Sequence, residues 1–151
     1  MESKNERGVE FCHREHVSAD WIDYNGHMNV AYFVLVFDHA TDAALEQLGL
    51  DENYRQTAGC SVFVSDMRVS YFREVIASEE LWIRSRLLSR DAKRLVIRHR
   101  MFCSRFDQAV ASNEVTCVHV DLSQRRSAPW PPAIATRLTS AISQDTEHRQ
   151  P

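Results

Sequence analysis

The longest hydrophobic pattern in the chain lies between Asn29 and Gly49, and it predicts a helix. No proline or glycine interrupts the run, Asn29 is a plausible N-cap, and Gly49 is a natural C-terminal stop. At 3.6 residues per turn, the helix should have about five turns. Its apolar positions cover more than the usual one-sided stripe: Tyr32, Phe33, Leu35, Val36, Ala40, Ala43, Ala44 and Leu48. We therefore expect the rest of the protein to wrap around this helix.

One narrow line of polar positions interrupts the apolar surface of the predicted helix. Asp38, Asp42 and Glu46 recur every four residues, so they share one face. We expect this line to be solvated, at the place where the wrapping of the helix is left open.

Five strand-like segments flank the helix, at residues 9–17, 60–72, 80–88, 94–102 and 110–122. Two of them alternate clearly between apolar and polar positions. In residues 80–88 the alternating sets are Leu81, Ile83 and Leu87 against Trp82, Arg84 and Arg86. This period of two indicates an antiparallel sheet with one covered face.

The order of these elements predicts the fold. A strand and the long helix come first, and a short connector at residues 51–59 leads into four consecutive strands. Three prolines then break the sheet pattern, ahead of a possible short helix at residues 133–142 and a polar tail from about residue 144. The simplest compact arrangement is an α+β fold in which an antiparallel five-stranded sheet wraps around one long central helix. This is the hotdog architecture, formed here as a single domain over residues 1–151.

Composition and charge narrow the function classes. The chain has 151 residues, of which 44% are hydrophobic and 26% charged, as in an ordinary globular domain. Its longest apolar stretch, at residues 30–37, is too short to span a membrane, and the first residues lack a signal-peptide core. The net charge of −3 gives no general attraction to nucleic acid. We expect a cytoplasmic protein with neither nucleic-acid nor membrane partners.

Cysteine and histidine spacing gives no metal or redox motif. No two cysteines form a C-x-x-C pair, and we expect all four to be reduced, buried and inert: Cys12, Cys60, Cys103 and Cys117. Cys12, His13 and His16 look superficially like ligands, yet a strand places His13 and His16 on opposite faces. No bound metal is therefore expected.

The most informative segment is DWIDYNGHMNVAYF, at residues 20–33, which forms a polar loop leading into the helix. A carboxylate such as Asp23 can attack an activated carbonyl directly, or it can take a proton from an attacking water. The N–H groups at the start of the helix could stabilise the developing oxyanion. Taken alone, Asp23 could equally close an Asx turn or cap the helix. Asp20, the rival acid, is interpreted as a loop-stabilising or solvated residue.

This loop resembles that of the 4-hydroxybenzoyl-CoA thioesterase-like family, in which an acid precedes a glycine, often a histidine, and then an asparagine. The resemblance implies a hotdog acyl-CoA thioesterase with Asp23 as its catalytic carboxylate. The implied substrate-binding residues of the loop are Tyr24, Gly26, His27, Met28 and Asn29. His27 could polarise the carbonyl or serve only as a structural hydrogen-bonding residue. Asn29 could orient a water molecule or only cap the helix.

Coenzyme A carries phosphates, so a basic cluster is expected near the mouth of the cleft. Lys93 and Arg94, at a predicted hairpin turn, resemble the position at which family members contact the nucleotide end, and Arg73 is a second candidate. The alternative is ordinary exposed charge. Because coenzyme A belongs to the substrate, no separate cofactor is expected.

Several segments are similar to thioesterases of carnitine metabolism that act on betainyl-CoA: residues 20–33, 37–45, 91–95 and 119–131. This similarity implies a short, cationic acyl group, whose trimethylammonium would need aromatic faces. Candidates are Trp21, Tyr24, Phe63 and Tyr71, although aromatics at such positions are more often core residues.

Two other functions fit the same fold. One is a hydratase of enoyl thioesters, in which an acid and His27 share the work; the other is a non-catalytic acyl-CoA-binding protein. The resemblance also implies a homodimer or homotetramer, with the site at a subunit interface.

Overall fold

The computed structural model describes residues 8–142, and its central element is the helix α1 (Val30–Gln47). Asn29 caps it as predicted, because its Oδ1 atom accepts a hydrogen bond from the N–H of Ala31 at 3.0 Å. Leu48 is the C-cap, and Gly49 follows with a φ of 84°, a value that favours glycine. The predicted helix and its two ends are confirmed.

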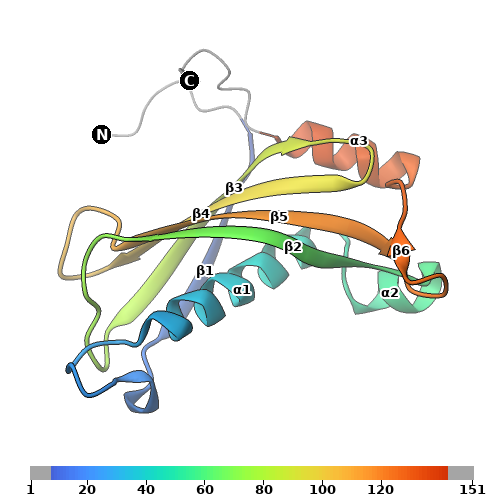
Figure 1. Cartoon of the computed structure of the whole chain (residues 1–151). Helices are drawn as coiled ribbons and strands as arrows, with labels where there is room; N and C mark the ends of the chain where they lie inside the picture. The colour runs from blue at the N-terminus through green and yellow to red at the C-terminus, as the bar shows by residue number, and fades with distance from the viewer. Residues whose placement is uncertain (1–7, 143–151) are drawn as a thin grey trace.

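An antiparallel sheet curls around α1 (Figure 1). Its strands are β1 (Glu10–His16), β2 (Cys60–Tyr71), β3 (Glu80–Arg90), β4 (Arg94–Cys103), β5 (Ala111–Asp121) and β6 (Arg126–Ser127). The order is β1-β3-β4-β5-β2, with β6 paired to β5. The five predicted strands are present, and the two-residue β6 makes the sheet six-stranded. The strands β1 and β2 lie at the two edges.

The alternation predicted for the middle strands is confirmed. Leu81, Ile83 and Leu87 of β3 are fully buried toward α1, whereas Trp82, Arg84 and Arg86 lie on the partly exposed outer face. The polar line on α1 is also where expected, since Asp38, Asp42 and Glu46 are all exposed. Burial of the apolar face between helix and sheet is the main stabilising contribution to such a fold.

A row of buried polar side chains runs through the core. Ser85, His99 and Asn113 are neighbours across β3, β4 and β5, and Thr41 of α1 lies against them. Thr41 donates its hydroxyl hydrogen to the carbonyl of Phe37, so its oxygen accepts from Nε2 of His99 at 2.8 Å. Nδ1 of His99 then accepts from the Ser85 hydroxyl at 2.6 Å. Burial lowers the pKa of His99 to about 4, which keeps this imidazole neutral.

Three shorter helical segments complete the described chain: η1 (Ala19–Trp21), α2 (Glu52–Ala58) and α3 (Pro132–Ala141). The helix α3 matches the prediction to within one residue at each end. The connector prediction for residues 51–59 is wrong, because α2 forms there, capped by Asp51, whose Oδ1 accepts from the N–H of Tyr54 at 2.9 Å.

The expectation of four buried cysteines is wrong for Cys12, which is exposed on β1, and for Cys60, which is only partly buried. Cys103 and Cys117 are buried, and burial raises the pKa of Cys117 to about 12. No helix among residues 8–142 is long and apolar enough to cross a membrane. The polar tail predicted from about residue 144 lies outside the described residues, and the single-domain extent over residues 1–151 stays a prediction.

Candidate active site

The loop between β1 and α1 is folded into a tight hairpin that presents Asp23. Ile22 and Met28 form an antiparallel bridge, and the N–H of Asp23 donates to the carbonyl of His27 at 3.2 Å. Gly26 turns the chain with a φ of 83°, and a Cβ built on it would meet nothing within 4 Å. The left-handed backbone conformation, rather than a shortage of space, therefore accounts for the glycine.

One backbone hydrogen bond fixes this hairpin to the body of the protein, and another closes its base. The N–H of Met28 donates to the carbonyl of Val75 at 2.7 Å, and the N–H of Asn29 donates to the carbonyl of Trp21 at 2.9 Å. The side chain of Met28 is fully buried in the core. The hairpin is therefore anchored on its Met28 side, while Tyr24 at its tip is 97% exposed.

The half-buried carboxylate of Asp23 accepts two hydrogen bonds. Its Oδ1 atom accepts from the N–H of Asn25 at 2.8 Å, which is an Asx turn. Its Oδ2 atom accepts from the side-chain amide of Asn29 at 3.2 Å. Asp23 does close an Asx turn, but Asn29, not Asp23, caps α1. The second hydrogen bond ties the carboxylate to the first turn of the helix.

A hollow of about 280 Å³ adjoins this loop, at the end of the edge strand β2. It is lined by His27, Met28, Val30, Phe33, Tyr71, Phe72, Arg73 and Glu74. The hydroxyl of Tyr71 donates to the carbonyl of Val30 at 3.2 Å, and the Tyr71 ring lies edge-on to Phe33. Several lining residues are exposed apolar groups, among them Val30, Tyr71 and Phe72. Asp23 is not one of the lining residues, and its loop reaches the hollow through His27 and Met28. An apolar hollow next to a loop that carries a carboxylate is an arrangement suited to binding an acyl group near a catalytic acid.

The structure brings only some of the predicted basic residues to this end of the sheet. Arg73 lines the hollow, donates to Oε1 of Gln108 at 2.5 Å and lies over the ring of Phe106. Lys93 and Arg94 are exposed at the turn between β3 and β4, where their N–H groups donate to Oδ1 of Asp91. This turn lies at the opposite end of β3 from the Asp23 loop, roughly 30 Å away at 3.3 Å per residue (Figure 1).

The aromatic side chains predicted to contact the acyl group also lie at different ends of the sheet. Trp21 lies beside the loop and stacks on Tyr32 with ring centroids 5.4 Å apart. Tyr71 lines the hollow, whereas Phe63 lies near the other end of β2 and is exposed. One chain therefore does not gather the four aromatic residues into a single pocket.

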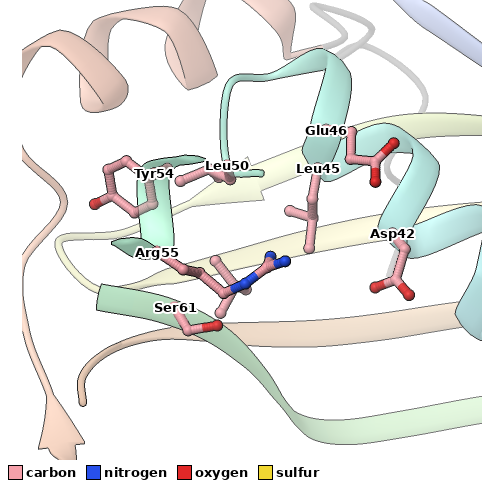
Figure 2. A pocket seen from close by; sticks show the side chains of 8 residues that line it. Asp42, Leu45, Glu46, Leu50, Tyr54, Arg55 and Ser61 are labelled. Atoms are coloured by element: carbon pink, nitrogen blue, oxygen red, sulfur yellow. The ribbon is translucent and has the colours of Figure 1, made fainter. Parts of the chain in front are cut away.

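A second hollow, of about 270 Å³, lies between α1, α2 and the start of β2 (Figure 2). Its wall consists of Asp42, Leu45, Glu46, Leu50, Tyr54, Arg55, Ser61 and Val62. Arg55 reaches across it from α2 in the direction of Asp42. Partial burial at the edge of this hollow and the charges of Asp38 and Glu46 raise the pKa of Asp42. Sequence reasoning did not find this hollow, because α2, which supplies one wall, was interpreted as a connector.

Comparison with known proteins identifies the family. A sequence model of the thioesterase-like superfamily matches residues 17–138. A betainyl-CoA thioesterase of Pseudomonas aeruginosa is 37% identical over 122 residues, which cover 81% of this chain and 77% of that protein. An L-carnitine dehydrogenase/betainyl-CoA thioesterase of Agrobacterium fabrum is 36% identical over 88% of this chain, which spans only 27% of that longer protein.

Solved structures show the same fold. The protein SAV2348 of Staphylococcus aureus, solved in complex with CoA, has a TM-score of 0.81 and 22% identity, over 87% of this chain and 83% of that one. The 1,4-dihydroxy-2-naphthoyl-CoA thioesterase Slr0204 of Synechocystis has a TM-score of 0.75 and 17% identity, over 87% and 96% of the two chains. The predicted hotdog fold is confirmed. The chain belongs to the thioesterase-like superfamily, and the enzyme class predicted from its sequence, a thioester hydrolase acting on acyl-CoA, is confirmed as well.

Proposed function

We propose that this enzyme hydrolyses a short-chain acyl-CoA, betainyl-CoA in particular, to the free acid and CoA, with Asp23 as the catalytic carboxylate. The observation that carries the proposal is the position of Asp23, on a hairpin at the start of α1 and held by Asn29. The 37% identity to a betainyl-CoA thioesterase over most of both chains supports the choice of acyl group.

The chemistry follows from what surrounds the carboxylate. Asp23 acts either as the nucleophile, forming an anhydride that water then cleaves, or as the base that deprotonates the attacking water. The first turn of α1 offers a donor for the oxyanion. Asn29 occupies the N–H groups of Ala31 and Tyr32, whereas the N–H of Val30 has no partner among the described residues. Val30 also lines the hollow beside the loop, so its N–H is a suitable oxyanion donor.

The remaining residues of the predicted site have supporting roles in this proposal. Gly26 shapes the hairpin, Met28 anchors it, and His27 borders the hollow with its Nδ1 atom 3.3 Å from the carbonyl of Met28. Tyr24 is too exposed to enclose a substrate within one chain. Its proposed contact with substrate therefore requires a neighbouring subunit.

We propose that this subunit is a second copy of the chain, bound along β2. The strand is twelve residues long, lies at the edge of the sheet and exposes Phe63, Val64 and Tyr71. A long edge strand with exposed apolar groups tends to pair with a strand of another chain, because its outer N–H and C=O groups have no partners in the sheet. Antiparallel pairing of two β2 strands would place the Cys60 end of one copy beside the Asp23 loop of the other. A homodimer, alone or within a homotetramer, would then contain two complete sites.

Such a dimer also supplies a place for a cationic acyl group. The hollow in Figure 2 carries two carboxylates, Asp42 and Glu46, against one guanidinium, and Tyr54 adds an aromatic ring. These groups suit a quaternary ammonium. Asp42 lies 13 residues beyond Asn29, roughly 20 Å along α1, which is too far for a short acyl chain in the same subunit. In the proposed dimer, the hollow of one copy serves the Asp23 loop of the other.

Release of free CoA from a panel of thioesters tests the proposal. We expect faster hydrolysis of betainyl-CoA than of acetyl-CoA, and little hydrolysis of palmitoyl-CoA. A preference for palmitoyl-CoA would reject the cationic acyl group. Hydration of an enoyl-CoA without CoA release would favour a hydratase, and binding of acyl-CoA without turnover would favour a non-catalytic protein.

A further inference from the structure

Three possible metal ligands from two elements meet on the side of α1 that faces β1. His13 and Glu15 are two residues apart on β1 and point to the same side, and His39 comes from α1. Nε2 of His13 lies 3.0 Å from Oε2 of Glu15, and Nδ1 of His39 lies 2.8 Å and 3.0 Å from the two carboxylate oxygens. The three ligand atoms all lie within 4.8 Å of one another.

The burial of these side chains suits a site that a dissolved ion can reach. The side chain of Glu15 is 17% exposed, that of His13 25% and that of His39 40%. The carboxylate is thus largely enclosed, while both imidazoles border solvent. In the sequence, the candidate ligands were Cys12, His13 and His16. The strand β1 places His13 and His16 on opposite faces, as expected. Glu15, two positions after His13, and His39, 26 positions after it, complete the set of three ligands. The sequence could not reveal this set, because it depends on how α1 packs against β1.

We propose that His13, Glu15 and His39 bind a divalent transition-metal ion, for which Zn²⁺ is the best match. Two imidazole nitrogens and one carboxylate oxygen are a donor set that zinc accepts, with water in the fourth position. Calcium and magnesium prefer oxygen ligands, so two nitrogen donors disfavour them.

The observed distances are close to those that a bound ion requires. At a Zn–N distance of 2.0–2.1 Å, ligands of a tetrahedral ion lie about 3.3 Å apart. The carboxylate and imidazole atoms now lie 2.8–3.0 Å apart, so they need to separate by only a few tenths of an ångström. The two imidazole nitrogens lie within 4.8 Å of each other, and a bound ion would hold them at the tetrahedral separation. Each neutral ring would carry its hydrogen on the other nitrogen, Nδ1 in His13 and Nε2 in His39. Neither of those nitrogens has a hydrogen-bonding partner among the described residues, and both rings border solvent, so water can accept there.

The position of the site indicates its effect. It joins the edge strand β1 to α1, and His39 lies ten residues beyond Asn29, roughly 15 Å from the start of the helix. A bound ion would therefore stabilise the β1–α1 contact rather than take part at Asp23. Because the ion binds the folded state, it should raise the melting temperature of the protein.

Calorimetric titration of the chelator-treated full chain with ZnCl₂, with thermal unfolding in parallel, tests the site. We expect saturable binding of one ion and a melting temperature several degrees higher in zinc. His13→Ala and His39→Ala should each weaken zinc binding by about tenfold or more, since loss of even an outer partner of a ligand weakens metal sites by about 10–100-fold. His16→Ala, on the exposed other face of β1, is the matched control and should bind zinc as the unaltered protein does.

Glu15→Gln keeps the size of the side chain and removes the charge, so it tests the site even if the histidine variants unfold. It should bind zinc more weakly, and replacement of zinc by Co²⁺ should give the visible absorption of a tetrahedral site in the unaltered protein only. Absence of zinc binding in the unaltered protein would overturn the proposal. Zinc affinity in His13→Ala, His39→Ala and Glu15→Gln that is unchanged from the unaltered protein would overturn it as well.

Discussion

Asn29 joins Asp23 to the central helix through a single side chain. Its amide nitrogen donates to Oδ2 of Asp23 at 3.2 Å, while its Oδ1 atom accepts from the N–H of Ala31 at 3.0 Å. The two functions left open in the sequence, capping the helix and positioning a catalytic group, are therefore compatible in one residue. The orientation of the carboxylate therefore depends on the same side chain that caps the helix.

Replacement of Asn29 by Ala should lower both activity and stability. Loss of the cap should reduce the free energy of unfolding by about 1 kcal/mol. Loss of the amide should free Asp23, and a misplacement of about 1 Å can reduce turnover by about 10²-fold, so kcat should fall more than KM changes. Asn25→Ala is the control, because only the backbone N–H of Asn25 contacts Asp23. Kinetics and urea unfolding of both variants test this prediction. An equal kcat in the two variants would show that Asn29 does not position the catalytic carboxylate.

Gly26→Ala should strain the hairpin without causing a clash. A Cβ at this position meets no atom within 4 Å, but the φ of 83° costs about 1–2 kcal/mol in any residue with a side chain. Gly59→Ala is a matched control, since Gly59 has a φ of 65° and equally open surroundings at the end of α2. Both variants should lose similar stability in urea unfolding, and only Gly26→Ala should lose kcat. A normal kcat in Gly26→Ala would show that the hairpin need not hold its shape.

Lys93→Ala combined with Arg94→Ala should raise the KM for acyl-CoA severalfold and leave kcat nearly unchanged. Both residues are exposed far from the Asp23 loop of their own chain, at the end of the sheet that the proposed dimer places beside the Asp23 loop of the other copy. There they would attract the phosphates of coenzyme A equally in the ground state and in the transition state. Raising the salt concentration should reduce the difference in KM between the double variant and the unaltered enzyme. Arg14→Ala removes another exposed cation on β1 and should leave KM unchanged. If the double variant also keeps its KM, the nucleotide end of the substrate binds elsewhere.

His99 should make folding stability depend on pH in the acidic range. Its pKa is lowered to about 4 in the folded protein by burial, against an ordinary value of 6.5. The unfolded chain therefore binds a proton that the folded chain rejects, so stability is full above pH 6.5 and is lost as the pH falls toward 4. The loss amounts to about 3 kcal/mol. Urea unfolding between pH 7.5 and 4.5 should show a weaker pH dependence in His99→Gln than in the unaltered protein, and identical slopes would reject this assignment.

The sequence was most informative where a residue's own neighbours determine its structure. The alternation of Leu81, Ile83 and Leu87 placed β3, and Asn29 and Gly49 marked the ends of α1, because caps and periodicity are local properties. The helix α2 was missed although Asp51 and Gly59 bound it, since its residues ENYRQTA show no apolar stripe.

Contacts between distant segments could not be predicted in this way. Asp23 and Asn29 are close in sequence, so their relation could be anticipated from the loop motif. His39 meets Glu15 across 24 residues, and Tyr54 meets His119 across 65, because the sheet curls around α1. Both the proposed metal ligands and the hollow of Figure 2 depend on such contacts, which no local pattern encodes.

The most direct test of the catalytic role is the kcat of Asp23→Asn for CoA release from betainyl-CoA, measured beside that of Asp20→Asn. Asparagine preserves the shape of the side chain but can neither attack the carbonyl nor accept a proton from water. We predict that Asp23→Asn folds normally and loses about 10²–10⁴-fold in kcat, while Asp20→Asn, in the preceding η1 segment, stays close to the unaltered enzyme. Near-normal turnover in Asp23→Asn would contradict the assignment of this carboxylate as the catalytic group.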